Sequence, residues 1–393
     1  MLYRRFGRTE LQMPVFTCGG MRFQHSWQDE KPTEESQKNL EATVEHALEL
    51  GSNHIETARG YGTSEEQLGL ILPRLPRQKI IVQTKVGPSK EVTEFKAKFE
   101  KSMSLLKLDY IDLFSVHGIN NRELLDQSVR TGGCLDAALE FKKQGRVRHI
   151  GFSTHASDTQ VISDACKDGR FDYVNLHYYY VNTVHGSAIE AARAQDMGVF
   201  IISPNDKGGL LYKPPEKLCK LTAPLSPMVF NNLWCLLHDN IHTLSIGPSR
   251  PSDFDEHIKT LQYLKGDQGK ELAQRIETNL REEMERVLGR EWMETWHVGL
   301  PRWEQAPQQV NLYEVVRLYN YAKALDMVEY GKMRYNLLGN GGHWFPGFRV
   351  DKLEGMDLTK AFPDSPHATR LPEVLREAHE MLKGEEVKRL STS

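Results

Sequence analysis

Four side chains of the types used in proton transfer follow three consecutive short, β-branched runs of the sequence. Glu56 and Tyr61 follow the second run of the chain, Lys85 ends the third and His117 ends the fourth. A phenol is a poor acid at neutral pH unless a nearby cation lowers its pKa, and Lys85 could supply that cation while Glu56 holds the ammonium in place. A neutral His117 could orient a carbonyl oxygen. The alternative is that the charged groups are solvated at the strand ends and the histidine is structural.

The elements that must position these groups are short apolar runs that alternate with amphipathic stretches. The predicted strands are 15–20, 52–57, 79–86, 111–117, 149–154, 173–180, 199–204 and 242–248, and the predicted helices include 37–50, 64–72, 92–106, 135–144, 158–167 and 188–195. Strand and helix repeating in turn predict parallel strands with crossover helices, and eight such strands predict a closed (β/α)₈ TIM barrel. A doubly wound nucleotide-binding sheet is the alternative, but no GxGxxG follows a strand.

Composition excludes several classes of protein. The 393 residues carry a net charge of −3, so no basic excess is available to bind nucleic acid. No apolar run approaches the ~20 residues that span a bilayer, and the start of the chain lacks the apolar core of a secretory signal. The cysteines are odd in number, form no CxxC pair and argue against a disulfide framework; they are Cys18, Cys134, Cys166, Cys219 and Cys235. We expect a soluble, cytoplasmic protein.

The sequence changes character after about Leu264. Residues 270–288 carry an apolar residue every four positions, which predicts a helix with one buried stripe. Residues 312–338 form a second helical stretch, and Gly/Pro-rich loops are predicted at 299–307 and 339–347. These patterns predict a barrel over 1–265 and a helical C-terminal extension over 266–393.

The run GSNHIETARGYGTSEEQLG (51–69) resembles the signature of the aldo-keto reductase superfamily. Further motifs follow in the family order: the opening YRRFGRTELQMPVFTCGGMRF, QTKV, LDYIDLFSVH, IGFSTHAS, SPNDKGGLL and SIGPSRPSDFDEHI. The resemblance implies an NADP(H)-dependent carbonyl reductase or alcohol dehydrogenase. It assigns Tyr61 as general acid, Lys85 as its activator, His117 as the group that orients the carbonyl, and Glu56 as the partner of Lys85. The family usually has Asp at the last position, so the longer Glu56 could misplace its carboxylate and slow the reaction.

The same resemblance implies a cofactor site. Ser153, Thr154 and Asn175 stand where the family holds the nicotinamide carboxamide, and Ile202 stands where an aromatic ring often stacks on the nicotinamide. The remaining implied cofactor residues lie in the loops after the first, seventh and eighth barrel strands; they are Gly20, Met21, Ser203, Lys207, Gly208, Gly209, Gly247, Ser249, Arg250 and Asp253. Arg250 favours the 2′-phosphate of NADP(H), whereas Asp253 favours the ribose hydroxyl of NAD(H).

The C-terminal part resembles a branch of the superfamily whose extension carries ferredoxin-like iron–sulfur motifs. GNGGHWFPGFRV (339–350) stands where those relatives place cluster-binding cysteines, and GLPRWEQAPQQVNL (299–312) resembles the other motif. No cysteine lies beyond Cys235, so we expect no iron–sulfur cluster and no metal site. We expect the aromatic residues Trp344, Phe345 and Phe348 to hold the 339–347 loop instead.

The resemblance therefore implies an enzyme that transfers hydride between NADP(H), or NAD(H), and a small carbonyl or alcohol such as an aldehyde, ketone or sugar. The sequence predicts no metal, no nucleic acid and no membrane partner. The alternative is a cofactor-binding regulatory protein whose catalytic site is weakened by Glu56 and by the altered extension.

Overall fold

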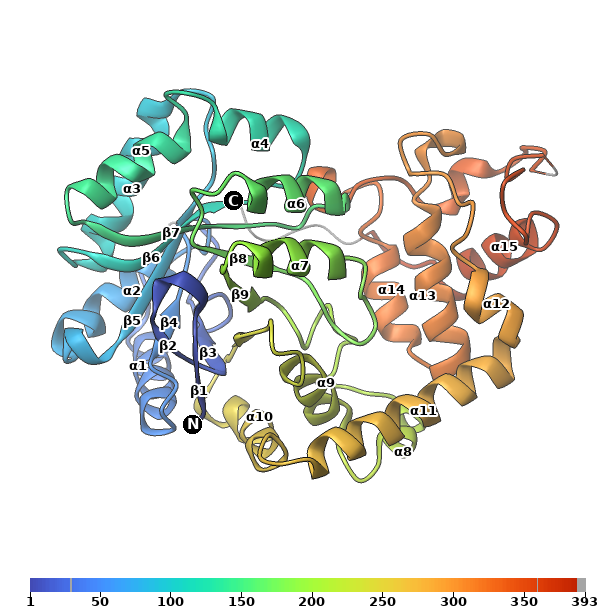
Figure 1. Ribbon diagram of the computed structural model, residues 1–393, viewed down its shortest axis with the longest axis horizontal. Coiled ribbons are helices and arrows are strands. Elements are labelled where there is room, and N and C mark those ends of the chain that lie inside the picture. Colours follow the sequence, from blue (N-terminus) through green and yellow to red (C-terminus); the bar gives the residue numbers. More distant parts are fainter. Residues whose placement is uncertain (29, 359, 387–393) are drawn as a thin grey trace. The chain divides into compact units, whose positions relative to one another are not determined.

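The predicted barrel strands form a closed parallel barrel in the computed structural model, which describes residues 1–28, 30–358 and 360–386 (Figure 1). Around the barrel the strands follow chain order, and β10 pairs with β3 to close the ring. The barrel strands are β3 (Phe16–Gly19), β4 (His54–Glu56), β5 (Ile81–Val86), β6 (Ile111–His117), β7 (Val147–Ser153), β8 (Tyr173–Leu176), β9 (Gly198–Ile201) and β10 (Thr243–Ile246). β7 begins two residues before its predicted start at 149 and β9 one residue before its predicted start at 199, whereas the other strands lie inside the ranges predicted from sequence. The TIM-barrel prediction is confirmed.

Helices connect consecutive barrel strands and cover the outside of the barrel (Figure 1). They are α1 (Glu34–Glu49), α2 (Ser64–Ile71), α3 (Val92–Leu106), α4 (Arg122–Val129), α5 (Cys134–Lys143), α6 (Thr159–Lys167) and α7 (Gly186–Ala194). The segment 118–133, which lies between a predicted strand and a predicted helix, contains the helix α4. Asn121 caps this helix by accepting a hydrogen bond from the Leu124 amide at 2.8 Å. With Leu125 as its one buried apolar side chain, α4 is too short to show a helical period in the sequence.

An antiparallel hairpin precedes the barrel, formed by β1 (Tyr3–Arg5) and β2 (Gln12–Pro14). Phe6 and Met13 from this hairpin join a buried cluster with the inward-facing side chains of four barrel strands, which are Ile81, Leu113, Tyr173 and Phe200. The Tyr173 ring crosses the Gly151 backbone, where a Cβ atom would lie 2.6 Å from the ring. The hairpin therefore fills the amino-terminal end of the barrel, and the opposite end holds the carboxyl ends of the strands.

The described residues divide into two compact units, one formed by 1–204 and 231–265 and the other by Asn205–Phe230 and 266–386. The division predicted at residue 265 stays a prediction, but the second unit also takes in the segment between β9 and β10. Helix α9 (Pro227–Leu236) crosses the boundary at residue 231, and α10 (Asp255–Ile258) belongs to the first unit. The helices of the second unit are α8 (Glu216–Thr222), α11 (Gln268–Leu288), α12 (Arg290–Thr295), α13 (Leu312–Leu325), α14 (Val328–Tyr335) and α15 (Leu371–Leu382).

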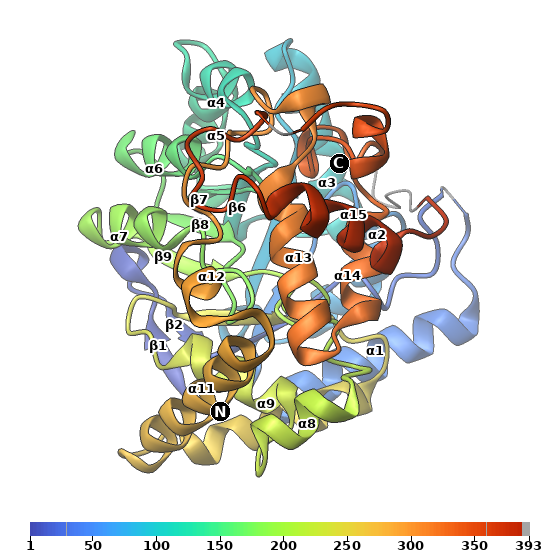
Figure 2. The same cartoon turned by 90° about the vertical axis from the view of Figure 1, so that its right-hand side faces the viewer.

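Within the second unit, α13 packs against α11, α14 and α15 (Figure 2). The apolar stripe predicted on 270–288 is buried in α11, from Leu272 through Ile276 and Leu280 to Leu288. The helix predicted over 312–338 is instead two helices. The backbone of Asp326 adopts a left-handed conformation with φ of 58°, which ends α13, and Asp tolerates that conformation better than most residues.

Backbone hydrogen bonds join the two loops that resemble iron–sulfur motifs. The Asn311 amide donates to the Phe348 carbonyl at 3.1 Å, and the Phe348 amide donates to the Gln309 carbonyl at 3.0 Å. The Asn311 side chain adds a hydrogen bond to the Pro346 carbonyl at 2.8 Å. Of the three aromatic residues expected to hold the loop, Phe345 is buried, whereas Trp344 is half-buried. No helix in the described ranges has both the length and the apolarity that a membrane crossing requires.

Candidate active site

The centre of the candidate site is an ion pair between Glu56, at the end of β4, and Lys85, on β5. Both side chains are almost fully buried, with 3% of Glu56 and 1% of Lys85 exposed. Burial lowers the pKa of the Lys85 ammonium well below its ordinary value. An opposite charge in contact with an ammonium favours its charged form, and Glu56 occupies that position here. The Lys85 Nζ also donates a hydrogen bond to the Thr57 carbonyl at 2.7 Å. The longer acid therefore reaches its partner in this barrel.

Glycine at position 19 provides room for this longer acid. Gly19 pairs with Glu56 across β3 and β4, and a Cβ atom on Gly19 would lie 3.3 Å from Glu56 Oε2 and 2.5 Å from Ser245 Oγ. A side chain at this position would push on the Glu56 carboxylate.

Tyr61 and His117 complete the cluster. The Tyr61 hydroxyl lies 3.5 Å from Glu56 Oε1, and the Lys85 Nζ lies 4.6 Å from the centre of the Tyr61 ring. The rings of Tyr61 and His117 meet edge to face, with centroids 5.9 Å apart. The structure thus brings together all four residues that the sequence suggested for proton transfer: an acid, a phenol, an amine and an imidazole.

The Tyr61 loop is held by a buried ion pair that the sequence analysis missed. Arg59 pairs with Glu65 at the start of α2, and Glu65 also accepts a hydrogen bond from the Thr84 hydroxyl at 2.6 Å. Burial raises the pKa of the Glu65 carboxyl, and the Arg59 charge opposes that shift. Because Thr84 precedes Lys85 on β5, this pair ties the loop that carries Tyr61 to the strand that carries Lys85. The only sequence signal was an arginine and a glutamate on either side of Tyr61.

The residues expected to hold a nicotinamide carboxamide lie on β7, in the turn after it and on β8. Ser153 pairs with His117 on one side and with Asn175 on the other. Asn175 is fully buried, and among the described residues neither its amide nitrogen nor its amide oxygen has a hydrogen-bond partner. A buried orphan amide is costly and calls for a ligand with a complementary donor and acceptor, as a carboxamide has. Thr154 differs, because its hydroxyl already donates to the Ile119 carbonyl at 2.7 Å and accepts from the Ala156 amide.

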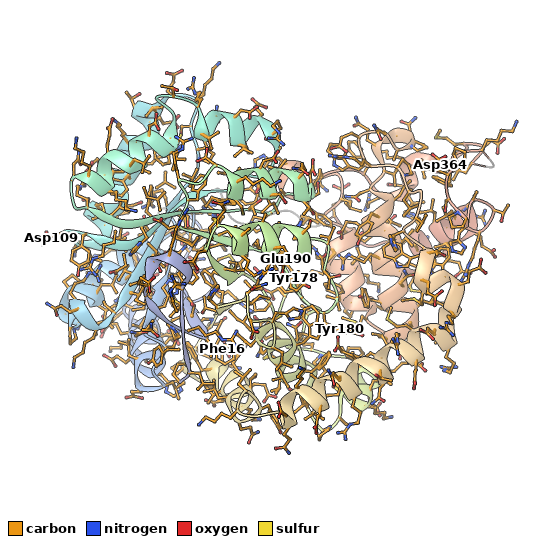
Figure 3. All side chains as sticks on the ribbon, viewed as in Figure 1. Phe16, Asp109, Tyr178, Tyr180, Glu190 and Asp364 are labelled. Carbon is orange, nitrogen blue, oxygen red and sulfur yellow. The ribbon has the colours of Figure 1, made fainter. Side chains whose placement is uncertain are left out.

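A second network missed by the sequence analysis begins where β8 ends. His177 contacts His155 through one ring nitrogen and the Tyr179 hydroxyl through the other, and Tyr179 donates to the Ile202 carbonyl. Figure 3 labels Tyr178 and Tyr180, which flank Tyr179 in this segment. Ser203, which follows Ile202, has a left-handed backbone with φ of 53°, a conformation that non-glycine residues rarely hold without support. The network therefore supports the turn that follows β9.

The loop after β10 places four of the predicted cofactor residues side by side. Asp253 accepts a hydrogen bond from the Ser249 amide at 2.7 Å and one from Arg250 Nε at 3.3 Å. The Arg250 side chain is 72% exposed. A Cβ atom built on Gly247 would contact only the aliphatic part of the Arg22 side chain among the described residues, with the Arg22 Cδ 3.2 Å away.

The other predicted cofactor residues are spread over three segments. Gly20, in the turn after β3, donates to the Glu56 carbonyl at 2.6 Å, and a Cβ atom on it would lie 2.8 Å from that oxygen. Gly20 is therefore required by packing at this point, and Met21 follows it, half-buried. Lys207 and Gly209 belong to the second compact unit, whereas Ser203 belongs to the first.

Across the part of the chain that the structure describes, no group of three or more His, Cys, Asp or Glu side chains could hold a metal ion.

Comparison with known proteins agrees with the barrel fold. Residues 16–224 match the model of the Aldo/keto reductase family. An L-galactose dehydrogenase from Arabidopsis thaliana is 32% identical over 188 residues, which is 44% of this chain and 58% of that protein. An NADH-specific methylglyoxal reductase from Escherichia coli is 24% identical over 188 residues, which is 42% of this chain and 56% of that protein. The chain thus matches little more than half the length of either relative.

Among solved structures, the holo form of an aldo-keto reductase from Bacillus halodurans superposes with a TM-score of 0.59 at 21% identity. The superposition covers 71% of this chain and 96% of that one, and it shows a shared fold. Since the family model matches more than half of the chain and includes Glu56, Tyr61, Lys85 and His117, the chain belongs to the aldo/keto reductase family, a family of oxidoreductases.

Proposed function

We propose that this protein is an NADP(H)-dependent oxidoreductase that interconverts a small carbonyl compound and the corresponding alcohol, with Tyr61 as general acid and base. The observation that carries the proposal is the convergence of Tyr61, Lys85, Glu56 and His117 at the carboxyl ends of three neighbouring barrel strands. Carboxyl strand ends are where TIM barrels place their chemistry.

Each side chain of the cluster has a distinct role in the proposed reaction. Tyr61 donates its phenolic proton to the carbonyl oxygen, and the Lys85 ammonium stabilises the negative charge that the phenol oxygen then carries. Glu56 keeps Lys85 charged in a buried position, where an unpaired ammonium would lose its proton. His117 donates a hydrogen bond that orients the same carbonyl oxygen. A bound reduced nicotinamide would supply the hydride.

The chain also has groups suited to a nicotinamide. The buried, unpartnered amide of Asn175 matches a carboxamide in both donors and acceptors, and Ser153 beside it offers a hydroxyl. Ser153 already accepts from the Gly118 amide at 3.2 Å, which leaves its own proton to donate. We do not assign the Thr154 hydroxyl to the carboxamide, because it is engaged with the neighbouring backbone.

NADP(H) is the proposed cofactor because the exposed guanidinium of Arg250 suits a phosphate dianion. Asp253 supports the NAD(H) alternative, because its carboxylate already binds Arg250 and the Ser249 amide and would repel a 2′-phosphate. A relative that is NADH-specific belongs to the same family.

The proposed substrates are small aldehydes, ketones or sugars, in line with the L-galactose dehydrogenase and methylglyoxal reductase among the relatives. A cytoplasmic location is part of the proposal. The regulatory alternative was motivated by Glu56 and by the altered extension, and contact between Glu56 and Lys85 weighs against the first of these.

Turnover of a panel of aldehydes, ketones and sugars with NADPH and with NADH tests the proposal. Tyr61→Phe should lower kcat by ~10²-fold or more while the Kd for the cofactor stays within a factor of about two, because the phenol contributes a proton and little binding. Tyr173→Phe is the matched control, since it removes a hydroxyl that bonds Ser115 at 2.9 Å inside the barrel. Cofactor binding without turnover in the unmodified protein would favour the regulatory alternative instead.

A further inference from the structure

The segment Asn205–Phe230, between β9 and β10, packs with the C-terminal extension. It carries three of the residues that the family resemblance implies for cofactor binding, Lys207, Gly208 and Gly209. Its contacts place it in the same compact unit as residues 266–386. One tie is an ion pair at 2.7 Å between Lys217, on α8, and Glu283, on α11. Hydrogen bonds from Arg286 and Lys217 lower the pKa of Glu283 to about 2, so this carboxylate is charged at any physiological pH.

A second contact involves Lys207, in the loop that the resemblance assigns to the cofactor. The hydroxyl of Tyr330, on α14, donates a hydrogen bond to the Lys207 carbonyl at 2.9 Å. That hydroxyl in turn accepts from Arg317 Nη1 at 3.2 Å, and Arg317 pairs with Glu314 at 2.6 Å. Tyr330 and Arg317 are both buried.

The polarity of this chain of hydrogen bonds is determined by its two ends. A carbonyl oxygen can only accept and a guanidinium can only donate, so the single Tyr330 proton must point at Lys207. A charged donor on the phenol oxygen strengthens the bond that the phenol gives, because neighbouring hydrogen bonds polarise one another.

The loop from Asn205 to Leu211 is tightly closed. The Leu211 amide donates to the Asn205 carbonyl at 2.9 Å, and the Leu210 amide donates to the Asp206 carbonyl at 2.9 Å. Leu210 is left-handed with φ of 54°. The Met327 methyl group lies over Gly209, where it would be 2.8 Å from a Cβ atom. Residues 327 and 330, at the start of α14, thus contact the loop at two points.

The hydrogen bond that holds the Lys207 carbonyl also determines where the Gly208 amide points. In a trans peptide the N–H lies opposite to the C=O, so the Gly208 N–H points away from α14. Backbone N–H groups of glycine-rich loops are common ligands of phosphate groups, whereas a carbonyl turned toward a phosphate would repel it.

We propose that α13 and α14 of the extension hold the 205–211 loop in the conformation that binds the pyrophosphate of the nicotinamide cofactor, and that Tyr330 is the positioning residue. This inference rests on the proposed function. It gives the extension a role that needs no iron–sulfur cluster: its helices orient the Lys207 carbonyl and the amide that follows it.

The test compares two conservative substitutions on the same helix. Tyr330→Phe removes the hydrogen bond to Lys207. Tyr335→Phe also removes a buried hydroxyl from α14, but one that bonds His379 at 2.6 Å and the Val350 amide at 3.1 Å. Dissociation constants are measured by calorimetry for NADPH, for ADP-ribose and for reduced nicotinamide mononucleotide, which lacks the pyrophosphate. Thermal unfolding of each variant is recorded in parallel.

We expect Tyr330→Phe to weaken NADPH and ADP-ribose by about three- to tenfold, the effect of losing one hydrogen bond. The mononucleotide should bind within a factor of about two of the unmodified protein, and Tyr335→Phe should leave all three ligands unchanged even if its Tm falls. Arg317→Lys, which removes the guanidinium from Tyr330, should act in the same direction and is a second variant if Tyr330→Phe folds poorly.

Two results would overturn the inference while leaving the proposed function intact. One is equal NADPH affinity in both tyrosine variants, and the other is an equal loss for all three ligands after Tyr330→Phe, which would indicate general damage. Failure of the unmodified protein to bind NADPH or NADH would instead refute the proposed function.

Discussion

Glu56 is the residue whose replacement tests the candidate site most directly. Glu56→Gln keeps the size of the side chain and removes its charge from the contact with Lys85. Leaving one member of a buried ion pair uncompensated costs roughly 3–5 kcal/mol if the remaining group stays charged. Release of its proton costs Lys85 less. Burial already lowers the pKa of Lys85, and each further pKa unit costs only ~1.4 kcal/mol. We therefore expect the variant to fold with a neutral Lys85.

A neutral Lys85 removes the cation that activates Tyr61. The kcat of Glu56→Gln at pH 7 should fall by ~10²–10⁴-fold, the range for loss of acid–base catalysis, while the Kd for NADPH is unchanged. A lysine with a lowered pKa regains its proton as the pH falls, so the kcat of this variant should rise toward acidic pH relative to that of the unmodified protein.

Glu56→Asp keeps the negative charge of the side chain but shortens the side chain. It shortens the side chain by one bond of ~1.5 Å, which takes a carboxylate oxygen now 3.5 Å from the Tyr61 hydroxyl beyond hydrogen-bond distance. The negative charge beside Lys85 is retained, so kcat should lie between those of the unmodified protein and Glu56→Gln.

Asp112→Asn is the matched control for loss of a buried carboxylate. Asp112 lies near the start of β6 and pairs with Arg77 at 2.7 Å and Arg148 at 3.0 Å, at the other end of the strand from His117. This variant should lose stability and keep kcat. A Glu56→Gln protein that is folded and retains most of its kcat at pH 7 would refute the assignment of Glu56 and Lys85.

Arg250→Ala should weaken NADPH at least ~10-fold more than NADH in fluorescence titrations, because only NADPH presents a 2′-phosphate to the guanidinium; equal losses would point to Asp253 as the selective group. Burial lowers the pKa of His257 to about 4. As the pH falls, His257 binds a proton in the unfolded chain, where its pKa is ~6.5, before it does so in the folded protein. The contribution of His257 to the free energy of unfolding is therefore constant above about pH 6.5 and decreases as the pH drops toward 4. At pH 5 His257 alone should cost roughly 2 kcal/mol in urea unfolding, and an equal free energy of unfolding at pH 7 and pH 5 would contradict this. Phe345→Ala should speed proteolysis of the extension more than the half-buried Trp344→Ala does, since loss of a buried aromatic ring costs ~3–5 kcal/mol; equal digestion rates would contradict the loop packing.

Local patterns in the sequence were sufficient to predict the barrel and the strand ends at which Glu56, Lys85 and His117 lie. Strands of a parallel barrel are short and apolar and alternate with amphipathic helices, so both the periodicity and the order of the elements are visible in one sequence. Glu56, Lys85 and His117 could be identified as neighbours because each ends a consecutive strand, and adjacent strand ends meet at the same edge of a barrel. The helix α4 and the break at Asp326 were missed because each depends on a few residues with too little periodicity to detect.

Distances between residues remote in sequence were decided by the tertiary structure alone. Whether Glu56 reaches Lys85 depends on the space that Gly19 leaves, and whether Thr154 is available depends on the Ile119 carbonyl. The association of 205–211 with α14 likewise depends on a hydrogen bond that spans 123 positions of the chain. Sequence patterns report which residues share a face of one element, because that follows from the backbone repeat. They do not report which faces meet, because side-chain packing between elements sets those contacts to within tenths of an ångström.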